Sequence, residues 1–224
     1  MVRRPDRPFW FNWLSWQTYH RHRTTKVAKR RAAWEFIQAI NAAPRGEIAI
    51  DCGANVGNVT AALVRCGFEV YAFEPDPLAL NVLRRRFANT SNVHIRACGV
   101  GTETGKQILY RWTAGASHPL SATTRSSVIA RSSEVAPTTI EIDIIKLVEF
   151  VRSLGRPVYL LKMDIEGAEV SILEQLLDAG LDKEIQFIFV ETHERFSDDI
   201  SQRTARLRQR IARDNIRNIN LDWF

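Results

Sequence analysis

Short apolar runs alternate with amphipathic segments along most of the chain. The apolar runs end in acidic or glycine-containing turns and indicate buried strands, at residues 47–51, 69–73, 93–97, 158–163 and 186–190. Beside them, apolar residues recur at three- and four-residue spacing, which predicts helices over residues 31–42, 59–66, 78–87, 144–154 and 203–213. Apolar strands that alternate with helices are typical of a parallel sheet covered on both faces. We therefore predict an α/β fold with a Rossmann-like, doubly wound, mostly parallel sheet.

The alternation is interrupted between residues 102 and 139. Serine, threonine, glycine and proline dominate this stretch, apart from an apolar run at residues 108–112 that fits a strand. A loop of this length inside a compact domain is usually functional, so it is the candidate lid or acceptor wall. At the other end of the chain, residues 219–224 fit an additional edge strand.

The first apolar run opens into the pattern Asp51-x-Gly53-x-Asn55-x-Gly57. This pattern indicates a strand, a tight glycine turn and a helix start, where a ligand can approach the backbone. A dinucleotide site would use Gly-x-Gly-x-x-Gly. The acid at position 51 would instead repel a diphosphate and suit a cation, such as the amino group of a methionine moiety.

A second acid, Glu74, ends the next apolar run. It lies roughly 20 residues further on, where such folds place the carboxylate that binds a ribose diol. A nucleoside with a cationic tail fits both acids, and S-adenosylmethionine has this chemistry. The alternative is an ordinary strand, turn and helix with surface acids.

Four segments together resemble the FkbM-type methyltransferases, a branch of the class I S-adenosylmethionine-dependent enzymes. They are IDCGANVGNVT, AFEPDP, LLKMDIEGAEVSIL and FIFVETHERF. The likeness runs from about Glu47 to Phe196, and KMDIEGAE is its most specific part. It implies the class I methyltransferase fold and O-methylation of a hydroxyl on a sugar, glycan or secondary metabolite, without fixing the acceptor. The family often has a serine pair in the long loop, which corresponds here to Ser126 and Ser127.

Ligands of open α/β sheets bind outside the carboxyl ends of the strands. The residues that follow the predicted strands should therefore converge, although they are far apart in sequence; they are Asp51, Glu74, Cys98, Asp164 and Glu191. We assign the cofactor S-adenosylmethionine to a set of residues at this edge: Asp51, Gly53, Asn55, Gly57, Glu74, Pro75, Cys98 and Asp164.

Methyl transfer requires an acceptor oxygen in line with the methyl group and the loss of the hydroxyl proton. His193 is the predicted base because its ordinary pKa lies near neutrality. Asp164 is its predicted partner, which would orient the hydroxyl, take its proton or bind the cofactor amine. The alternative is a structural role for His193. Glu169 is also expected to be structural, because acids in a first helical turn are favoured by the helix dipole.

A metal site is the less favoured alternative at the same edge. Asp164, Glu166, Glu191 and His193 offer oxygen and imidazole ligands, and some methyltransferases of the wider class bind magnesium at strand ends. No spacing among them is diagnostic of a metal. We therefore predict no metal, and keep Asp164, Glu191 and His193 as the alternative ligand set.

The length of 224 residues and the hydrophobic content of 45% suit one compact catalytic domain. We predict a basic, aromatic, helical appendage at residues 1–46 and the methyltransferase domain at residues 47–224. The cysteines, Cys52, Cys66 and Cys98, are odd in number and lack metal-ligand spacing. A reduced compartment is expected for such a chain, and we predict a cytoplasmic location.

The net charge of +6 is unevenly distributed. Residues 1–46 hold ten Lys/Arg against two acids (+8), residues 47–202 hold fifteen against twenty-one (−6), and residues 203–224 hold six against two (+4). An acidic core argues against a nucleic-acid partner. Two alternatives nevertheless stand. One is an RNA ribose 2′-O-methyltransferase acting through Lys162, Asp164 and Glu191, and the other is a non-catalytic cofactor-binding scaffold.

The N-terminal segment has its own pattern. Trp10, Trp13 and Trp16 are three residues apart and are followed by a cluster of Lys and Arg. Indole rings beside cations suit peripheral contact with a membrane surface, here its inner face. The favoured alternative is an aromatic helix face that packs on the domain or on a second copy in a homodimer. The pattern fits neither a signal peptide nor a membrane span.

Overall fold

The computed structural model of the chain describes residues 26–111 and 138–223. Its main sheet has six strands in the order β3-β2-β1-β7-β8-β9, and all of their pairings are parallel. The strands are β1 (Ile48–Cys52), β2 (Glu69–Phe73), β3 (Val93–Arg96), β7 (Val158–Met163), β8 (Ile185–Val190) and β9 (Ile219–Asn220). The chain crosses from β1 to the edge strand β3 and returns to the other side of β1 with β7. This confirms the doubly wound, parallel sheet.

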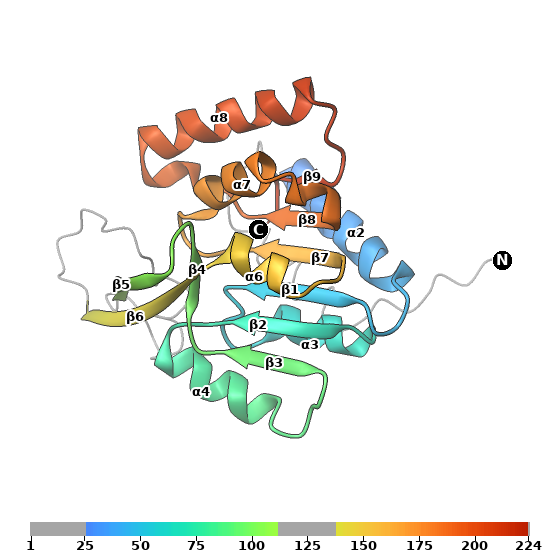
Figure 1. Cartoon of the computed structure of the whole chain (residues 1–224), viewed down its shortest axis with the longest axis vertical. Coiled ribbons are helices and arrows are strands. Elements are labelled where there is room, and N and C mark those ends of the chain that lie inside the picture. The colour runs from blue at the N-terminus through green and yellow to red at the C-terminus, as the bar shows by residue number, and fades with distance from the viewer. Residues whose placement is uncertain (1–25, 112–137, 224) are drawn as a thin grey trace.

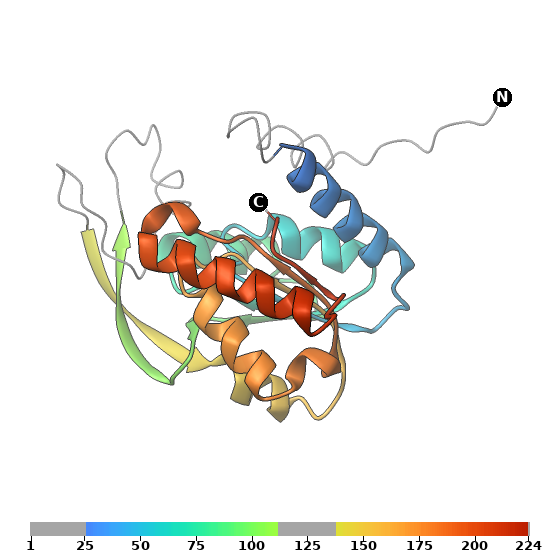
Figure 2. The same ribbon diagram turned by 90° about the horizontal axis from the view of Figure 1, so that it is seen from above.

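Helices cover both faces of the sheet (Figures 1 and 2). One face carries α2 (Lys26–Ala42), α3 (Asn58–Arg65) and α4 (Pro77–Arg86). The other carries α6 (Leu147–Ser153), α7 (Glu169–Asp178) and α8 (Asp198–Arg213), and a short 3-10 turn at Leu181–Glu184 leads from α7 into β8. A second 3-10 turn, Glu194–Phe196, joins β8 to α8.

The side chains of the central strands point alternately to the two faces of the sheet and contribute to a hydrophobic core on each face. In β1, Ile48 and Ile50 pack with the residues of α6, α7 and α8, whereas Ala49 packs with those of α2 and α3. In β7, Leu161 packs on the side of α6, α7 and α8, and Leu160 packs on the side of α2 and α3. Successive side chains of a strand point to opposite faces, so these strands must be apolar at every position. This explains the continuous apolar runs in the sequence.

The helix α2 is packed into this core. The ring of Phe36 lies 5.2 Å from that of Phe189 in β8 and 4.4 Å from that of Trp223, between ring centroids. Phe36 and Trp223 are 1% and 2% exposed. The helix begins at Lys26, one turn and more before the predicted start at residue 31, and its apolar face completes the fold of the domain that follows it.

A small second sheet was not predicted. It has the order β4-β6-β5, formed by β4 (Gly99–Gly101), β5 (Gly105–Arg111) and β6 (Thr138–Lys146). The predicted strand at residues 108–112 is found as part of β5, whereas the loop predicted at residues 138–139 and the helix predicted at residues 144–146 were wrong. Residues 138–146 alternate polar and apolar side chains, and Ile142 and Ile144 pack on Leu109 in a core of their own. The helix α6 starts only at Leu147.

Two further boundaries differ from the predictions. The helix α8 starts at Asp198, five residues early, because Ser197 Oγ accepts a hydrogen bond from the Ile200 amide at 3.2 Å and caps a polar first turn. The edge strand β9 covers only Ile219 and Asn220. No helix within residues 26–111 and 138–223 is long and apolar enough to cross a membrane. Trp10, Trp13, Trp16, Ser126 and Ser127 lie outside the described residues.

Candidate active site

The glycine turn after β1 runs directly against the end of β7. Gly53 has φ 76°, and a Cβ atom at this position would lie 1.9 Å from the backbone oxygen of Asp164. Gly57 has φ 83°, and its Cβ would lie 2.5 Å from the ring of Phe87. Gly57 is also the N-cap of α3 and has no side chain to cap the helix. The amides of the turn itself are already hydrogen-bonded, those of Gly53 and Ala54 to Phe73 O. What the turn brings to the carboxyl edge of the sheet is the N-terminus of α3.

Beneath the turn lies a buried ion pair between Asp51 and Lys162. Lys162 Nζ is 3.2 Å from Asp51 Oδ1 and donates to the carbonyl oxygens of Cys52 and Gly53 at 3.2 and 2.8 Å. The other Asp51 oxygen accepts from Thr60 Oγ1 at 2.7 Å. Burial lowers the pKa of Lys162, but Asp51 and Asp164 raise it, and the net direction is upward.

This pair changes the role expected for Asp51. The carboxylate is fully buried, and its cation is the chain's own lysine rather than a ligand. Asp51 therefore holds Lys162 against the carbonyls of the glycine turn and shapes the cofactor site from below. The signal that sequence reasoning missed was Lys162 itself, because a lysine within a continuous apolar strand requires a buried partner.

Glu74 connects the ends of β1 and β2. Its Oε2 accepts from the amide of Asn55 at 2.7 Å, and its Oε1 accepts from the amide of Asp76 at 2.8 Å. Burial raises the pKa of Glu74 to about 7, although these two amides lower it. Asn55 is held in the left-handed region, with φ 50°. Glu74 thus fixes the glycine turn and lies at the position expected for a ribose-binding carboxylate.

The neighbouring Asp76 ties the small sheet to this region. Arg111, the last residue of β5, donates to both Asp76 oxygens, at 2.9 Å from Nε and 2.5 Å from Nη2. Asp76 Oδ1 also accepts from the Leu78 amide and caps α4. A bidentate arginine–carboxylate pair is a rigid link. The small sheet, towards which the arrowheads of the central strands point in Figure 1, is therefore anchored beside the cofactor turn.

Pro75 and Cys98 lie at the same edge. A Cβ atom on Gly99 would be 3.7 Å from Pro75 Cγ, so the segments that follow β2 and β3 adjoin. Cys98 is half-buried, and burial raises the pKa of its thiol. Contact of Pro75 and Cys98 with the cofactor stays a prediction.

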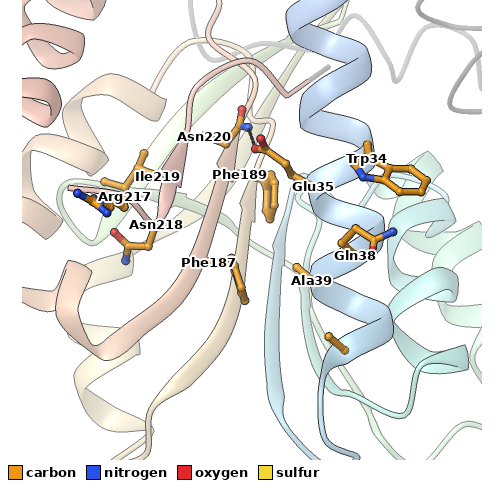
Figure 3. Close-up of a pocket in the computed structure, with 11 residues that line it drawn as sticks. Trp34, Glu35, Gln38, Ala39, Phe187, Phe189, Arg217, Asn218, Ile219 and Asn220 are labelled. Carbon is orange, nitrogen blue, oxygen red and sulfur yellow. Dashed lines mark hydrogen bonds between the residues drawn. The ribbon is translucent and has the colours of Figure 1, made fainter. Parts of the chain in front are cut away.

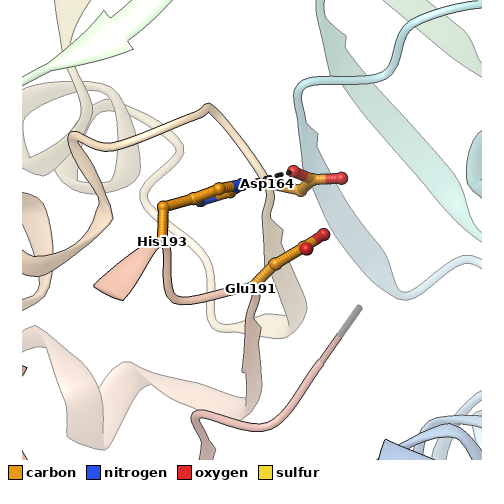
Figure 4. A group of neighbouring side chains, drawn as sticks. All are labelled: Asp164, Glu191 and His193. Atoms are coloured by element: carbon orange, nitrogen blue, oxygen red, sulfur yellow. Dashed lines mark ion pairs between the residues drawn. The ribbon is translucent and has the colours of Figure 1, made fainter. Parts of the chain in front are cut away.

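The ends of β7 and β8 carry a cluster of acids around one imidazole (Figure 4). Asp164 follows β7, and Glu191 follows β8, with the Glu191 amide donating to Met163 O at 2.9 Å. His193 Nε2 lies 3.8 Å from Asp164 Oδ1 and 3.4 Å from Glu166 Oε2. One ligand atom each of Asp164, Glu191 and His193 falls within 4.8 Å of the others. Of the strand-end residues predicted to converge, Asp164 and Glu191 therefore lie together, beside His193.

Glu169 orients the imidazole from its other side. Its Oε1 lies 2.8 Å from His193 Nδ1, and its two oxygens accept from the amides of Ile165 and Gly167. Glu169 was expected only to stabilise the start of α7, and its contact with His193 was missed. The two residues are 24 positions apart, so no local pattern reveals this contact. Glu166 has φ 63°, a strained backbone that aims its side chain at the same ring.

The electrostatics of the cluster also change the role expected for His193. Burial lowers the pKa of the imidazole, but Glu169, Glu166 and Asp164 raise it, to about 9 in all. An imidazole with such a pKa is a cation at neutral pH and cannot accept another proton. Burial, followed by the charge of Asp164, raises the pKa of Glu191 to about 7. Asp164, the other member of the predicted catalytic pair, is 31% exposed.

A groove elsewhere on the molecule has no part in this site. It has a volume of about 500 Å³ and lies between α2 and the β8–β9 edge (Figure 3). Trp34, Phe187 and Phe189 give it apolar walls, and a hydrogen bond of 2.7 Å from Asn220 to Glu35 crosses it. None of its lining residues belongs to the acidic cluster or to the glycine turn.

Comparison with known proteins agrees with this geometry. The family model described as the methyltransferase FkbM domain matches residues 51–217, which include the glycine turn, the Glu74 segment and the acidic cluster. The chain belongs to the FkbM methyltransferase family. This confirms the resemblance found in the sequence, and the cofactor of the family, S-adenosylmethionine, is the cofactor expected from the residues.

Individual relatives are more distant. The chain is 27% identical over 154 residues to "Methyltransferase 1" of Beauveria bassiana, and the match covers 62% of each chain. The chain thus spans about three-fifths of the length of this curated relative. Among solved structures, the human methyltransferase 10 domain containing protein matches 96% of this chain and 75% of its own, at 8% identity and a TM-score of 0.40. A putative RNA methyltransferase from Pyrococcus horikoshii matches 79% and 71%, at 12% identity and a TM-score of 0.36.

The residues present fit S-adenosylmethionine. Gly53 lets the turn pack directly on the backbone of Asp164, α3 begins at a glycine cap, and Glu74 lies buried one strand away. The acidic cluster adjoins the same turn because Gly53 and Asp164 are in contact through their backbones. A cationic sulfonium and a hydroxyl acceptor would both find complementary negative charge at this edge.

Proposed function

We propose that this FkbM-family protein transfers a methyl group from S-adenosylmethionine to a hydroxyl of a sugar, a glycan or a secondary metabolite. The observation that carries the proposal is the contact between Gly53 and Asp164, which joins the cofactor turn to a buried cluster of acids and an imidazole. Such a cluster suits an oxygen acceptor because it can bind a hydroxyl and receive its proton.

The residues around the cofactor act mainly by holding the glycine turn in a fixed shape. Glu74 holds the amide of Asn55 in place and presents its carboxylate to a ribose diol. Lys162 fixes the carbonyls of Cys52 and Gly53, so that the turn keeps its shape. When bound, S-adenosylmethionine supplies an activated methyl whose C–S bond breaks, with the electron pair leaving to sulfur, as the acceptor oxygen forms a C–O bond.

The proton of the acceptor hydroxyl is assigned to Asp164. This carboxylate is partly exposed, lies at the end of β7 and is flanked by Lys162 Nζ at 3.9 Å and His193 Nε2 at 3.8 Å. Both neighbours are held in place by other acids, so they stay fixed while the hydroxyl is oriented. Catalysis then rests on alignment and proton removal, because the sulfonium is already a good leaving group.

The test is methyl transfer from labelled S-adenosylmethionine to panels of sugars, glycans and phenolic or alcoholic metabolites. For an active acceptor, Asp164→Asn should lower kcat by roughly 100-fold while S-adenosylmethionine affinity stays within about twofold of the wild type. Glu184→Gln, an exposed acid outside the cluster, is the matched control and should leave both unchanged. Cofactor binding with no transfer to any hydroxyl panel would contradict the proposal and support the scaffold alternative.

The RNA alternative is disfavoured by the position of Lys162. A catalytic lysine must reach the substrate, whereas this one is 3% exposed and already donates to two carbonyl oxygens beside Asp51. Salt-sensitive RNA binding with ribose methylation would overturn this conclusion.

Peripheral membrane contact, a cytoplasmic location and a homodimer stay predictions. The membrane contact rests on the tryptophans before residue 26. Flotation of the chain with anionic liposomes, compared with a chain that lacks residues 1–25, tests it, because a membrane-contacting segment should be required for flotation. Equal flotation of both forms would contradict the idea.

A further inference from the structure

The cluster at the ends of β7 and β8 has the composition of a cation site. Within the part of the chain that the structure describes, Asp164, Glu191 and His193 each offer one ligand atom, and the three atoms lie within 4.8 Å of one another. The first two follow neighbouring parallel strands, and the amide of Glu191 bonds to Met163 O. The backbone of the sheet therefore holds the two carboxylates side by side, as Figure 4 shows.

An independent observation comes from the imidazole. His193 is completely buried, and among the described residues its Nε2 makes no hydrogen bond. This atom is directed towards Asp164 and Glu166, at 3.8 and 3.4 Å. A buried polar atom without a hydrogen bond is costly, unless a ligand completes its environment.

The other ring nitrogen is already held. His193 Nδ1 lies 2.8 Å from Glu169 Oε1, and Glu169 is fixed by the amides of Ile165 and Gly167. Histidines that bind metals commonly donate their second N–H to a carboxylate, which fixes the tautomer and aims the free lone pair at the ion. Metal binding would displace the proton that Nε2 carries in the metal-free chain. The same arrangement would then direct the Nε2 lone pair towards the side of the ring where Asp164 lies.

We propose that Asp164, Glu191 and His193 bind a divalent metal ion. Two carboxylates and one imidazole suit a hard to borderline ion such as Mn²⁺. Ligand atoms bound at about 2.2 Å lie at most about 4.4 Å apart. The observed spread of 4.8 Å would close with shifts of a few tenths of an ångström. Water and acceptor oxygens would complete the coordination.

This inference deepens the proposed function and rests on it for its catalytic role. Asp164 touches the cofactor turn through the backbone contact with Gly53, so an ion at this site would lie beside the methyl donor. A bound divalent ion gathers the oxygens of a substrate and lowers the pKa of a hydroxyl. Because the ion lowers the pKa of the hydroxyl, the carboxylate of Asp164 would then suffice to accept the hydroxyl proton. The expected acceptor is a vicinal diol or another pair of adjacent oxygens, which can bind one ion together.

The test counts Mn²⁺ bound to the full chain, treated first with a chelator that is then removed. Electron paramagnetic resonance of free Mn²⁺ measures the count without acceptor and without turnover. We expect one saturable Mn²⁺ per chain. Asp164→Asn and Glu191→Gln, which change charge but little volume, should each weaken binding at least tenfold, whereas Glu184→Gln should bind as the wild type does.

A stoichiometry near zero, or binding unchanged in both cluster variants, would overturn the metal site. Calorimetric titration with S-adenosylmethionine on the same samples separates this result from failure of the proposed function. If no Mn²⁺ binds while the cofactor binds and hydroxyls are methylated, the metal proposal fails and the function stands. If Mn²⁺ binds as expected but no hydroxyl is methylated, the function fails and the metal site stands.

Discussion

Buried charged residues decide most of the chemistry of this protein at the scale of single residues. Lys162 and Asp51 neutralise each other beneath the glycine turn, and Glu169 fixes the orientation of His193. Ionised groups of this kind are rarely buried unless they are paired. Their partners lie on different strands and helices, so each pair also locks two elements together.

The Lys162–Asp51 pair predicts a non-additive stability effect. Lys162→Met should lower the free energy of unfolding by about 3–5 kcal/mol, because it leaves a buried carboxylate without its cation. Lys162→Met combined with Asp51→Asn should recover part of this loss, since the amide keeps a hydrogen bond to Thr60 without a charge. Urea denaturation of the single and double variants measures the coupling. Purely additive losses would show that the pair is not coupled.

Glu74 predicts a pH dependence of stability. Burial raises the pKa of its carboxyl from 4.5 to about 7. The folded chain thus keeps a proton that the unfolded chain releases in this range, and the stabilisation is lost as the pH rises through 7. Between pH 5 and pH 8, the free energy of unfolding should fall by up to about 3 kcal/mol more for the wild type than for Glu74→Gln. Chemical denaturation at both pH values checks this, and parallel pH profiles would refute it.

At the scale of elements, the site depends on how closely the turn after β1 approaches the end of β7. Strand pairing sets this approach, because β1 and β7 are neighbours in register from Ala49 to Cys52. The side of the site formed by β5 and β6 depends on a different contact, the Arg111–Asp76 pair. The turn after β1 and the small sheet, which are distant in sequence, thus both border the site at the carboxyl edge of the main sheet.

Gly53 provides the test at this scale. Gly53→Ala would place a methyl carbon 1.9 Å from Asp164 O and should abolish cofactor binding and destabilise the fold. Gly180→Ala is the matched control, since Gly180 has a similar φ of 70° and nothing within 4 Å of its Cβ position. The control should lose only the roughly 1–3 kcal/mol of a strained backbone. Equal losses, measured by thermal unfolding and calorimetry, would mean that the approach to β7 is unimportant.

For the whole molecule, the two ends of the described chain meet on one face of the sheet. Phe36 of α2 and Trp223 near the C-terminus pack on Phe189 of the central sheet. The sequence placed α2 in an appendage, but this helix supports β8, the strand that leads into Glu191. We expect the stability of this strand, and with it the acidic cluster, to depend on α2.

Phe36→Ala should lower the free energy of unfolding by about 3–5 kcal/mol, because it leaves a cavity between α2, β8 and Trp223. Trp34→Ala, on the same helix but 57% exposed, should change it by less than about 0.5 kcal/mol. Denaturation in urea measures both variants. Similar small effects would indicate that α2 is only loosely attached to the domain.

The sequence predicted correctly those elements whose pattern lies within a few neighbouring residues. The continuous apolar runs of β2 and β7 were predicted at their observed bounds, and the turn at Gly53 and the strand-end acids lie where they were expected. The prediction failed at β6, whose alternation was interpreted as a loop and the start of a helix. The mistake arose because β6 pairs with β5, about 30 residues earlier, and packs in a small core that no local period reveals.

The sequence determined the sheet, the family and the residues at the carboxyl edge, because apolar periodicity and motif spacing are properties of neighbouring positions. Only the tertiary structure decided what those residues do. Lys162 neutralises Asp51, Glu169 orients His193, and three carboxylates make that imidazole a cation rather than a free base. Such roles depend on burial and on partners from other strands, and both arise only when the chain has folded.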